Sequence, residues 1–89
     1  MLSEEQLIRR AMQEIVPIFG KPYLQKNFNK ILRSDGIINE GREYMLFLGI
    51  KTRDDLPEKE ANEKGWTVYG LVHIDTETGI RTKLEYAVE

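Results

Sequence analysis

Cysteine is absent from this chain of 89 residues, so neither a disulfide nor a thiolate metal site can hold it together. Long hydrophobic runs are absent as well, and no window approaches the roughly 20 apolar residues that a membrane-spanning helix needs. The first residues, MLSEEQLIRRAMQEIV, mix charged and apolar side chains and lack the continuous apolar stretch of a signal peptide. We therefore expect a cytoplasmic protein whose stability depends on one well-packed core or on a partner.

The motifs that usually carry catalysis or ligand binding are also missing. The chain has no G-x-S-x-G, no P-loop and no G-x-G-x-x-G, and its serines, Ser3 and Ser34, lie where a helix is expected to begin or end. The acidic run from Asp54 to Glu60 lacks the spacing of an EF-hand and is interrupted by a lysine. His73 is the only histidine, so a metal would find no second imidazole or thiolate beside it. We expect no catalytic residue, no metal ligand and no cofactor.

The composition that remains is that of one small globular domain spanning residues 1–89, with 40% apolar and 31% charged residues. A helix over about 3–16 is predicted by a capping box, Ser3 followed by Gln6, and by a stripe of apolar side chains at helical spacing. Pro17 is expected to end this helix, because it biases the preceding residue away from the helical conformation. The stripe consists of Leu7, Ile8, Ala11, Met12 and Ile15.

A second helix is predicted over about 21–33, where Pro22 stands near the first position and apolar and basic side chains fall on different sides. Ser34-Asp35-Gly36 would end it, since glycine tolerates the left-handed conformation at a helix end. The pattern leaves a second interpretation open, in which residues 30–39 form a strand that turns back through Asn39-Glu40-Gly41.

From Arg42 onward the hydrophobic pattern changes to a period of two, which predicts strands. The first of them, REYMLFLGIK, is apolar on both faces, as is typical of a central strand or of one covered on both sides. The charged segment 53–65 has no apolar stripe and is expected to be a mobile acidic loop. The expected strands are about 42–52, 66–75 and 80–88.

The last two strands form a hairpin around Asp75-Thr76-Glu77-Thr78-Gly79, in one of two registers. A three-residue loop pairs Thr76 with Ile80, whereas a four-residue loop pairs Asp75 with Ile80. The three-residue loop is favoured because it places nearly all the apolar side chains on one face, and a slip of one residue would turn every side chain over.

In the favoured register, residue pairs across the hairpin can be assigned. Gly70 lies opposite Tyr86, whose ring would cover the glycine. His73 lies on the other face opposite Lys83, where we expect a surface histidine without a role in a site. The favoured register also pairs Val72 with Leu84 and Ile74 with Thr82.

Together these elements predict an α+β fold, with two N-terminal helices packed on one face of a three-stranded, mainly antiparallel sheet. The opposite face then displays apolar side chains, and clusters of this kind mark interaction surfaces. We expect this face to bind another protein or, in a homodimer, a second copy of the chain. The alternative is that loop 53–65 folds over it. The residues expected to bind the partner are Met45, Phe47, Tyr69 and Leu71.

A different class of function, association with nucleic acid, is suggested by the basic side chains of the helix predicted at 21–33. Residues 1–34 carry six Lys/Arg and only three Glu, although the whole chain has a net charge of −2. Lys26, Lys30 and Arg33 would reach phosphates from one face of that helix. This is the alternative to protein binding.

The two ends of the chain share a pattern with a known group of domains. The opening helix begins LSEEQLI, and the chain closes with an aromatic strand, a turn and a final strand in GWTVYGLVHIDTETGIRTKLEY. On these residues the chain resembles PepSY-like domains and the related layout of some small bacterial toxin-immunity proteins. The resemblance implies a small binding or inhibitory module of bacterial or phage-like type, with no catalytic residues; it leaves residues 17–41 without a counterpart, and the secretion signal common in PepSY proteins is missing. The residues that carry it are Leu2, Ser3, Glu5, Gln6, Ile8, Trp66, Val72, Asp75, Thr78 and Gly79.

Overall fold

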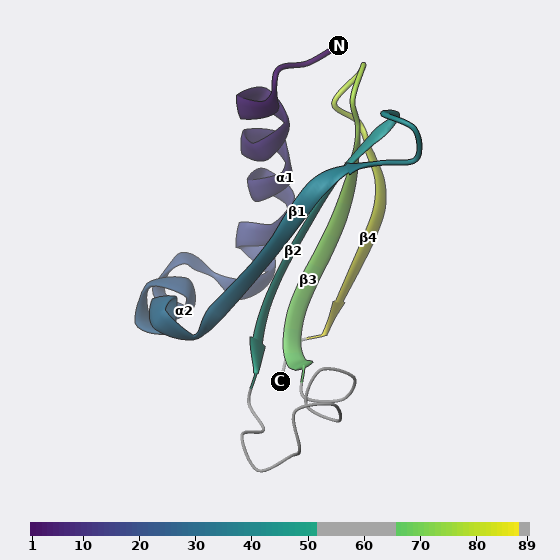
Figure 1. Cartoon of the computed structure of the whole chain (residues 1–89). Coiled ribbons are helices and arrows are strands. Elements are labelled where there is room, and N and C mark those ends of the chain that lie inside the picture. The colour runs from purple at the N-terminus through teal and green to yellow at the C-terminus, as the bar shows by residue number, and fades with distance from the viewer. Residues whose placement is uncertain (52–65, 88–89) are drawn as a thin grey trace.

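The computed structural model of the chain describes residues 1–51 and 66–87 and has an α+β fold. One long helix lies against a four-stranded antiparallel sheet whose strands follow one another in the order β1-β2-β3-β4 (Figure 1). The predicted three-stranded sheet therefore has one strand too few. The elements are α1 (Glu4–Phe19), α2 (Lys21–Lys26), a 3₁₀ turn (Phe28–Lys30), β1 (Ile31–Ile38), β2 (Glu43–Lys51), β3 (Trp66–Asp75) and β4 (Arg81–Ala87).

Helix α1 begins with the predicted capping box. The Ser3 hydroxyl accepts a hydrogen bond from the Gln6 amide at 3.1 Å, and the Ser3 amide donates to the Gln6 side chain at 2.9 Å. The predicted end at Pro17 is wrong, because the helix continues to Phe19 and ends at Gly20 with φ of 84°. Pro17 lies exposed in the last turn. It has no amide proton to donate to the carbonyl of Gln13, one turn earlier, but Gln13 is exposed, so water can bind there and the proline is tolerated.

The helix predicted at 21–33 begins at Lys21 as expected but ends too early, and the alternative interpretation of residues 30–39 as a strand is confirmed over Ile31–Ile38. Helix α2 ends at Lys26, and the Asn27 side chain donates to the Tyr23 carbonyl at 2.9 Å, which satisfies a carbonyl of the last turn. The chain then extends as β1 and returns through a turn in which Asn39, Glu40 and Gly41 all have positive φ. All eight β1 residues pair with β2, and this pairing stabilises the strand more than the helical spacing of the apolar side chains favours a helix.

The core lies between α1 and the two central strands. Leu7, Ala11 and Ile15 of α1 are buried against the strand residues that point toward the helix. These positions alternate along β2 and β3, which explains the period of two in the sequence. The buried strand residues are Tyr44, Leu46, Leu48, Ile50, Val68, Val72 and Ile74.

The β3–β4 hairpin combines features of both predicted registers. The Asp75 amide donates to the Ile80 carbonyl at 2.8 Å, as the four-residue loop requires, so the predicted Thr76–Ile80 pair is wrong. Ile74 then pairs with Arg81 and His73 with Lys83, so that Thr82 is an extra residue on β4. This bulge restores the predicted body of the hairpin, in which Val72 faces Leu84 and Gly70 faces Tyr86.

Gly70 is covered by the end of α1 and not by the ring predicted to cover it. A methyl group added at Gly70 would lie 3.2 Å from Cε2 of Phe19 and 3.6 Å from Cγ2 of Ile15. Tyr86 lies opposite on β4 but is 59% exposed. The glycine therefore makes room for the helix to approach the sheet closely.

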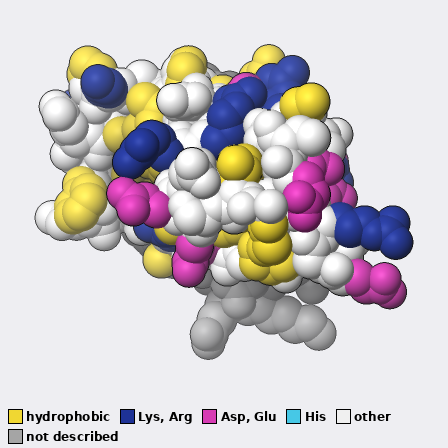
Figure 2. All heavy atoms as spheres, turned by 90° about the horizontal axis from the view of Figure 1, so that it is seen from above, with side chains coloured by type: hydrophobic (Ala, Val, Ile, Leu, Met, Phe, Trp, Pro, Cys, Tyr) yellow, Lys and Arg dark blue, Asp and Glu magenta, His cyan; other side chains and the backbone are white. Residues whose placement is uncertain are grey.

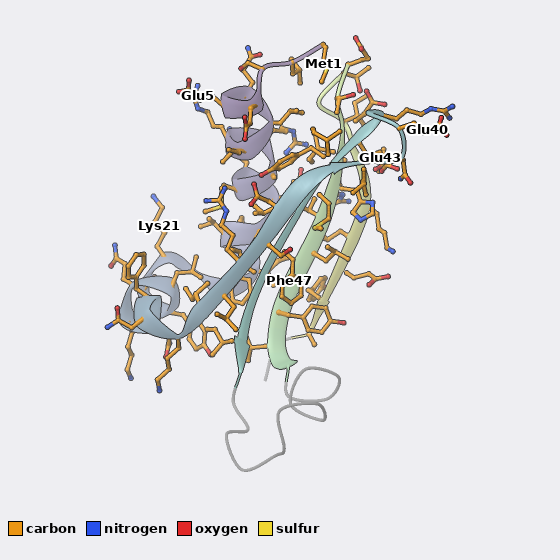
Figure 3. The ribbon with its side chains drawn as sticks, in the orientation of Figure 1. Met1, Glu5, Lys21, Glu40, Glu43 and Phe47 are labelled. Atoms are coloured by element: carbon orange, nitrogen blue, oxygen red, sulfur yellow. The ribbon has the colours of Figure 1, made fainter. Side chains whose placement is uncertain are left out.

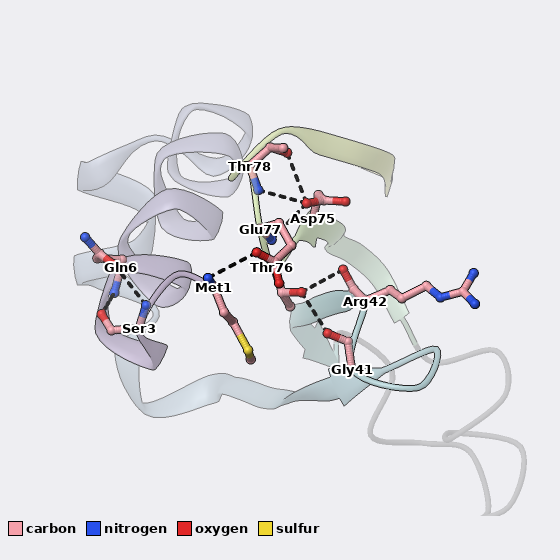
Figure 4. A network of polar contacts seen from close by, with 9 residues as sticks. All are labelled: Met1, Ser3, Gln6, Gly41, Arg42, Asp75, Thr76, Glu77 and Thr78. Carbon is pink, nitrogen blue, oxygen red and sulfur yellow. Dashed lines mark hydrogen bonds and ion pairs between the residues drawn. The ribbon is translucent and has the colours of Figure 1, made fainter.

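Thr76 ties together the two turns at one end of the sheet (Figure 4) and also bonds to the segment that precedes α1. Its hydroxyl lies 2.7 Å from the Gly41 carbonyl oxygen and 3.0 Å from that of Arg42, and its amide donates to Arg42 at 2.9 Å. The Thr76 carbonyl accepts from the Leu2 amide at 2.8 Å. Because the side chain is only 1% exposed, these bonds are formed out of water.

Candidate protein-interaction face

The sheet has a second face, which points away from α1 and which we call the distal face. It is built from the strand positions that alternate with the buried ones, including Met45 and Phe47 of β2 and Tyr69 and Leu71 of β3. Figure 3 shows Phe47 in the middle of the sheet and Glu43 nearer the turns. The structure thus brings the residues predicted to bind a partner onto one face, where each is partly exposed.

An aromatic pair forms the centre of the distal face. The rings of Phe47 and Tyr69 stack with their centroids 6.0 Å apart and their planes inclined by 26°. Leu71 lies directly opposite Phe47, and Met45 directly opposite His73, in the β2–β3 register. Cross-strand aromatic and aliphatic pairs stabilise a sheet and also form a preorganised apolar surface. The expectation that 53–65 is a mobile acidic loop, and the alternative that it folds over this surface, concern residues outside those that the structure describes.

At the end of the distal face nearest the turns lies a polar cluster that the sequence analysis missed. Nδ1 of His73 lies 3.4 Å from Oε2 of Glu43, and the same carboxylate accepts hydrogen bonds from Thr82 and Asn39. His73 was predicted to face Lys83, which is confirmed, but its side chain is only 15% exposed and has a carboxylate partner. Finding this partner from sequence required the β2–β3 register, which no local pattern supplies.

The cluster fixes a negative charge on the distal face. Hydrogen bonds from Thr82 and then from Asn39, with His73 adding to them, hold the pKa of Glu43 below its usual value of 4.5, against the opposing effect of burial. The Thr82 hydroxyl bonds to Glu43 and not to the imidazole, and the lowered pKa makes this carboxylate a weak base. Within residues 1–51 and 66–87, no group of three or more His, Asp or Glu side chains is placed to hold a metal ion.

Strand β4 adds a second charged border to the distal face. Nζ of Lys83 lies 3.3 Å from Oε1 of Glu85, and these residues are paired with His73 and Leu71, respectively. The apolar centre is thus flanked by the Glu43 carboxylate at the end nearest the turns and by the Lys83–Glu85 ion pair along β4. Such a rim orients a partner without supplying most of the binding energy.

The basic residues of the nucleic-acid hypothesis do not share one helix face. Lys26 is the last residue of α2, Lys30 belongs to the 3₁₀ turn, and Arg33 lies on β1 with its guanidinium 3.4 Å from Asp35. Helix α2 ends before it reaches Lys30 and Arg33, so no single helix presents the three side chains as this hypothesis requires. At the end of the molecule that carries the turns, basic, acidic and hydrophobic side chains are interspersed (Figure 2).

Comparisons with protein-family models, with curated proteins and with solved structures find no significant match. The likeness to PepSY-like domains accordingly stays an expectation drawn from the sequence. Among the helices that the structure describes, none has both the length and the apolar composition needed to cross a membrane. The case for a function therefore depends on the geometry of the distal face.

Proposed function

We propose that this protein is a small, non-catalytic protein-binding module that docks on another protein through the distal face. The observation that carries the proposal is the stacked Phe47–Tyr69 pair, with Met45 and Leu71 beside it, on the side of the sheet opposite α1. Aromatic and methionine side chains are enriched at the centres of interfaces, and the aromatic ones provide large contact area at a low cost in side-chain entropy.

The proposed mechanism is occlusion of the partner's surface. Burial of the apolar centre drives association, while the Glu43–His73 cluster on one border and Lys83–Glu85 on another set the orientation. An inhibitor, an immunity-type protein or an assembly subunit acts in this way and needs no reacting group.

The proposal is tested by placing a photo-crosslinking amino acid at position 71 and, as a control, at position 13, which is exposed on α1. In cells of the source organism we expect position 71 to crosslink a discrete protein that position 13 does not. The crosslinked protein is then purified and titrated with wild-type chain and with the Tyr69→Asp variant. We expect the substitution to weaken binding by about tenfold or more, because it places a charge in the desolvated centre.

Lys30→Glu is the matched control, since it changes a charge away from the distal face and should leave the affinity unchanged. We also expect the affinity to change little with salt concentration, as apolar contacts dominate. A steep loss of affinity with salt, together with loss of binding in Lys30→Glu, would instead indicate phosphate contacts and contradict the proposal.

A further inference from the structure

Strand β1 forms one edge of the sheet, and within residues 1–51 and 66–87 no segment pairs with its outer side. An edge strand offers a row of backbone donors and acceptors to any chain that can match it, and proteins usually protect such edges with lysines, prolines or bulges. The other edge, β4, has such protection in the bulge at Thr82 and in Lys83. The sequence of β1, ILRSDGII, contains neither lysine nor proline, and its pairing with β2 has no register shift. Its two charged side chains, Arg33 and Asp35, are opposite in sign, so they do not repel a second copy in every register.

The side chains of β1 also keep apolar surface exposed. Leu32 on the distal face and Ile37 on the face of α1 are each 48% exposed. Helix α1 packs over β2 and β3, and beside it lies a hollow of about 500 Å³ lined by residues that include Leu7, Ile37 and Tyr44. On the face of α1, most of strand β1 therefore lacks the cover that the helix gives to the central strands.

Two copies of one strand can pair antiparallel about a two-fold axis only in a few registers. Residues directly opposite each other must point to the same face of the sheet. The axis therefore has to lie where one residue is opposite its own copy, because a shift by half a residue would place neighbouring residues, which point to different faces, opposite each other. For β1 the central choices are Arg33, Ser34 and Asp35. An axis through Arg33 or Asp35 sets two like charges directly opposite each other, which destabilises the pair.

An axis through Ser34 gives a self-complementary strand pair. Arg33 of each copy then lies opposite Asp35 of the other, which forms two reciprocal pairs of opposite charge on the face of α1. In the same register Ile31 lies opposite Ile37, and Leu32 lies opposite Gly36 on the distal face. Arg33 and Asp35, which lie 3.4 Å apart within one chain, thus each gain a partner of opposite sign from the other chain, and Ile37 gains an apolar neighbour.

We propose that this protein forms a two-fold homodimer through β1, with Ser34 on the axis, so that two four-stranded sheets become one continuous sheet. The surface concerned is an edge and not the distal face, so this inference is independent of the proposed function. Isologous pairing of this kind is the commonest way in which a single surface serves both subunits. In the dimer the two distal faces lie side by side as one surface.

Single-cysteine crosslinking tests the register directly, because the natural chain has no cysteine. In the dimer the two Cα atoms at position 34 are about 4.5–5.5 Å apart, a separation that a disulfide can span. We expect Ser34→Cys to form a covalent dimer rapidly under mild oxidation. Glu85→Cys, on the exposed edge strand β4, is the matched control and should crosslink only slowly.

Charge reversal tests the pairing in solution by light scattering over a wide range of concentrations. We expect wild type to be a dimer and both Arg33→Asp and Asp35→Arg to be monomers, because each variant sets like charges opposite each other. An equimolar mixture of the two variants should regain the dimer mass, since an edge with two carboxylates then meets an edge with two guanidiniums. Circular dichroism of each variant checks that it is folded before mixing.

A wild-type chain that stays monomeric at all concentrations, with Ser34→Cys crosslinking no faster than Glu85→Cys, would overturn the proposal. Dimers that persist in Arg33→Asp but dissociate in Lys83→Glu would overturn it as well, because they would show that β4 is the interface. Neither outcome affects the crosslinking test of the distal face.

Discussion

At the scale of single residues, Thr76 determines how the turns meet. It lies in a loop, where side chains are usually exposed, yet it is among the most buried side chains of the described residues. Its hydroxyl donates one proton and lies within hydrogen-bond distance of two carbonyl oxygens from the β1–β2 turn. One side chain thus connects the two turns at the end of the sheet where α1 also begins.

Replacing Thr76 with valine keeps the shape of the side chain and removes only the hydroxyl. The Gly41 carbonyl then loses this donor, whereas the Arg42 carbonyl keeps the backbone amide of residue 76. Because the hydroxyl is buried, we expect the free energy of unfolding to fall by about 1–3 kcal/mol. Thr78→Val is the control, because the Thr78 hydroxyl also bonds within this turn, to Asp75 and Ile80, but lies exposed, where water can replace those bonds. Equal effects of the two substitutions in urea denaturation would show that burial of the hydroxyl is not the cause.

At the scale of elements, the contact between the end of α1 and β3 depends on the absence of a side chain at Gly70. Phe19 fills the space that a β-carbon would need, at a distance of 3.2 Å from its ideal position. Strand interiors usually disfavour glycine, so its presence here is explained by this close approach.

Gly70→Ala should therefore destabilise the protein. Overpacking typically costs about 1–3 kcal/mol, which exceeds the gain of about 0.4–1 kcal/mol from removing the flexibility of glycine in the unfolded chain. In a Phe19→Leu background the new methyl group has room, and we expect the same substitution to become neutral or stabilising. A double-mutant cycle from denaturation midpoints measures this coupling, and strict additivity would contradict the contact.

The elements also show which features a sequence can reveal. The start of α1 was predictable because Ser3, Gln6 and the following apolar stripe are all local to it. The segment after Lys30 was ambiguous because Phe28, Ile31 and Leu32 fit a helical face, whereas the strand is stabilised by pairing with β2, which no local pattern records. The Glu43–His73 contact was missed for the same reason, since it depends on how β2 aligns with β3.

At the scale of the whole molecule, Glu14 links α1 to the far strand of the sheet. Its carboxylate lies 3.1 Å from the Arg81 guanidinium of β4 and also pairs with Arg10 one turn earlier in α1. The hydrogen bond from Arg10 is the main cause that lowers the pKa of Glu14 below its usual value of 4.5; burial opposes this shift, and the charges of Arg10 and Arg81 add to it. The ionised form is therefore favoured in the folded state.

Stability should then depend on pH in a defined direction. A carboxyl group whose pKa is lower in the folded state contributes its full stabilisation above about pH 4.5, the value in the unfolded chain, and loses it as the pH falls through the folded pKa. We expect the difference in melting temperature between wild type and Glu14→Gln to be largest near neutral pH and to shrink below pH 4.5. Thermal denaturation followed by circular dichroism from neutral to acidic pH measures this difference.

Glu5→Gln is the control, because the Glu5–Arg9 pair lies on the exposed surface within α1 and contributes little. A wild-type advantage over Glu14→Gln that is the same at every pH would show that the carboxylate acts through packing and not through its charge.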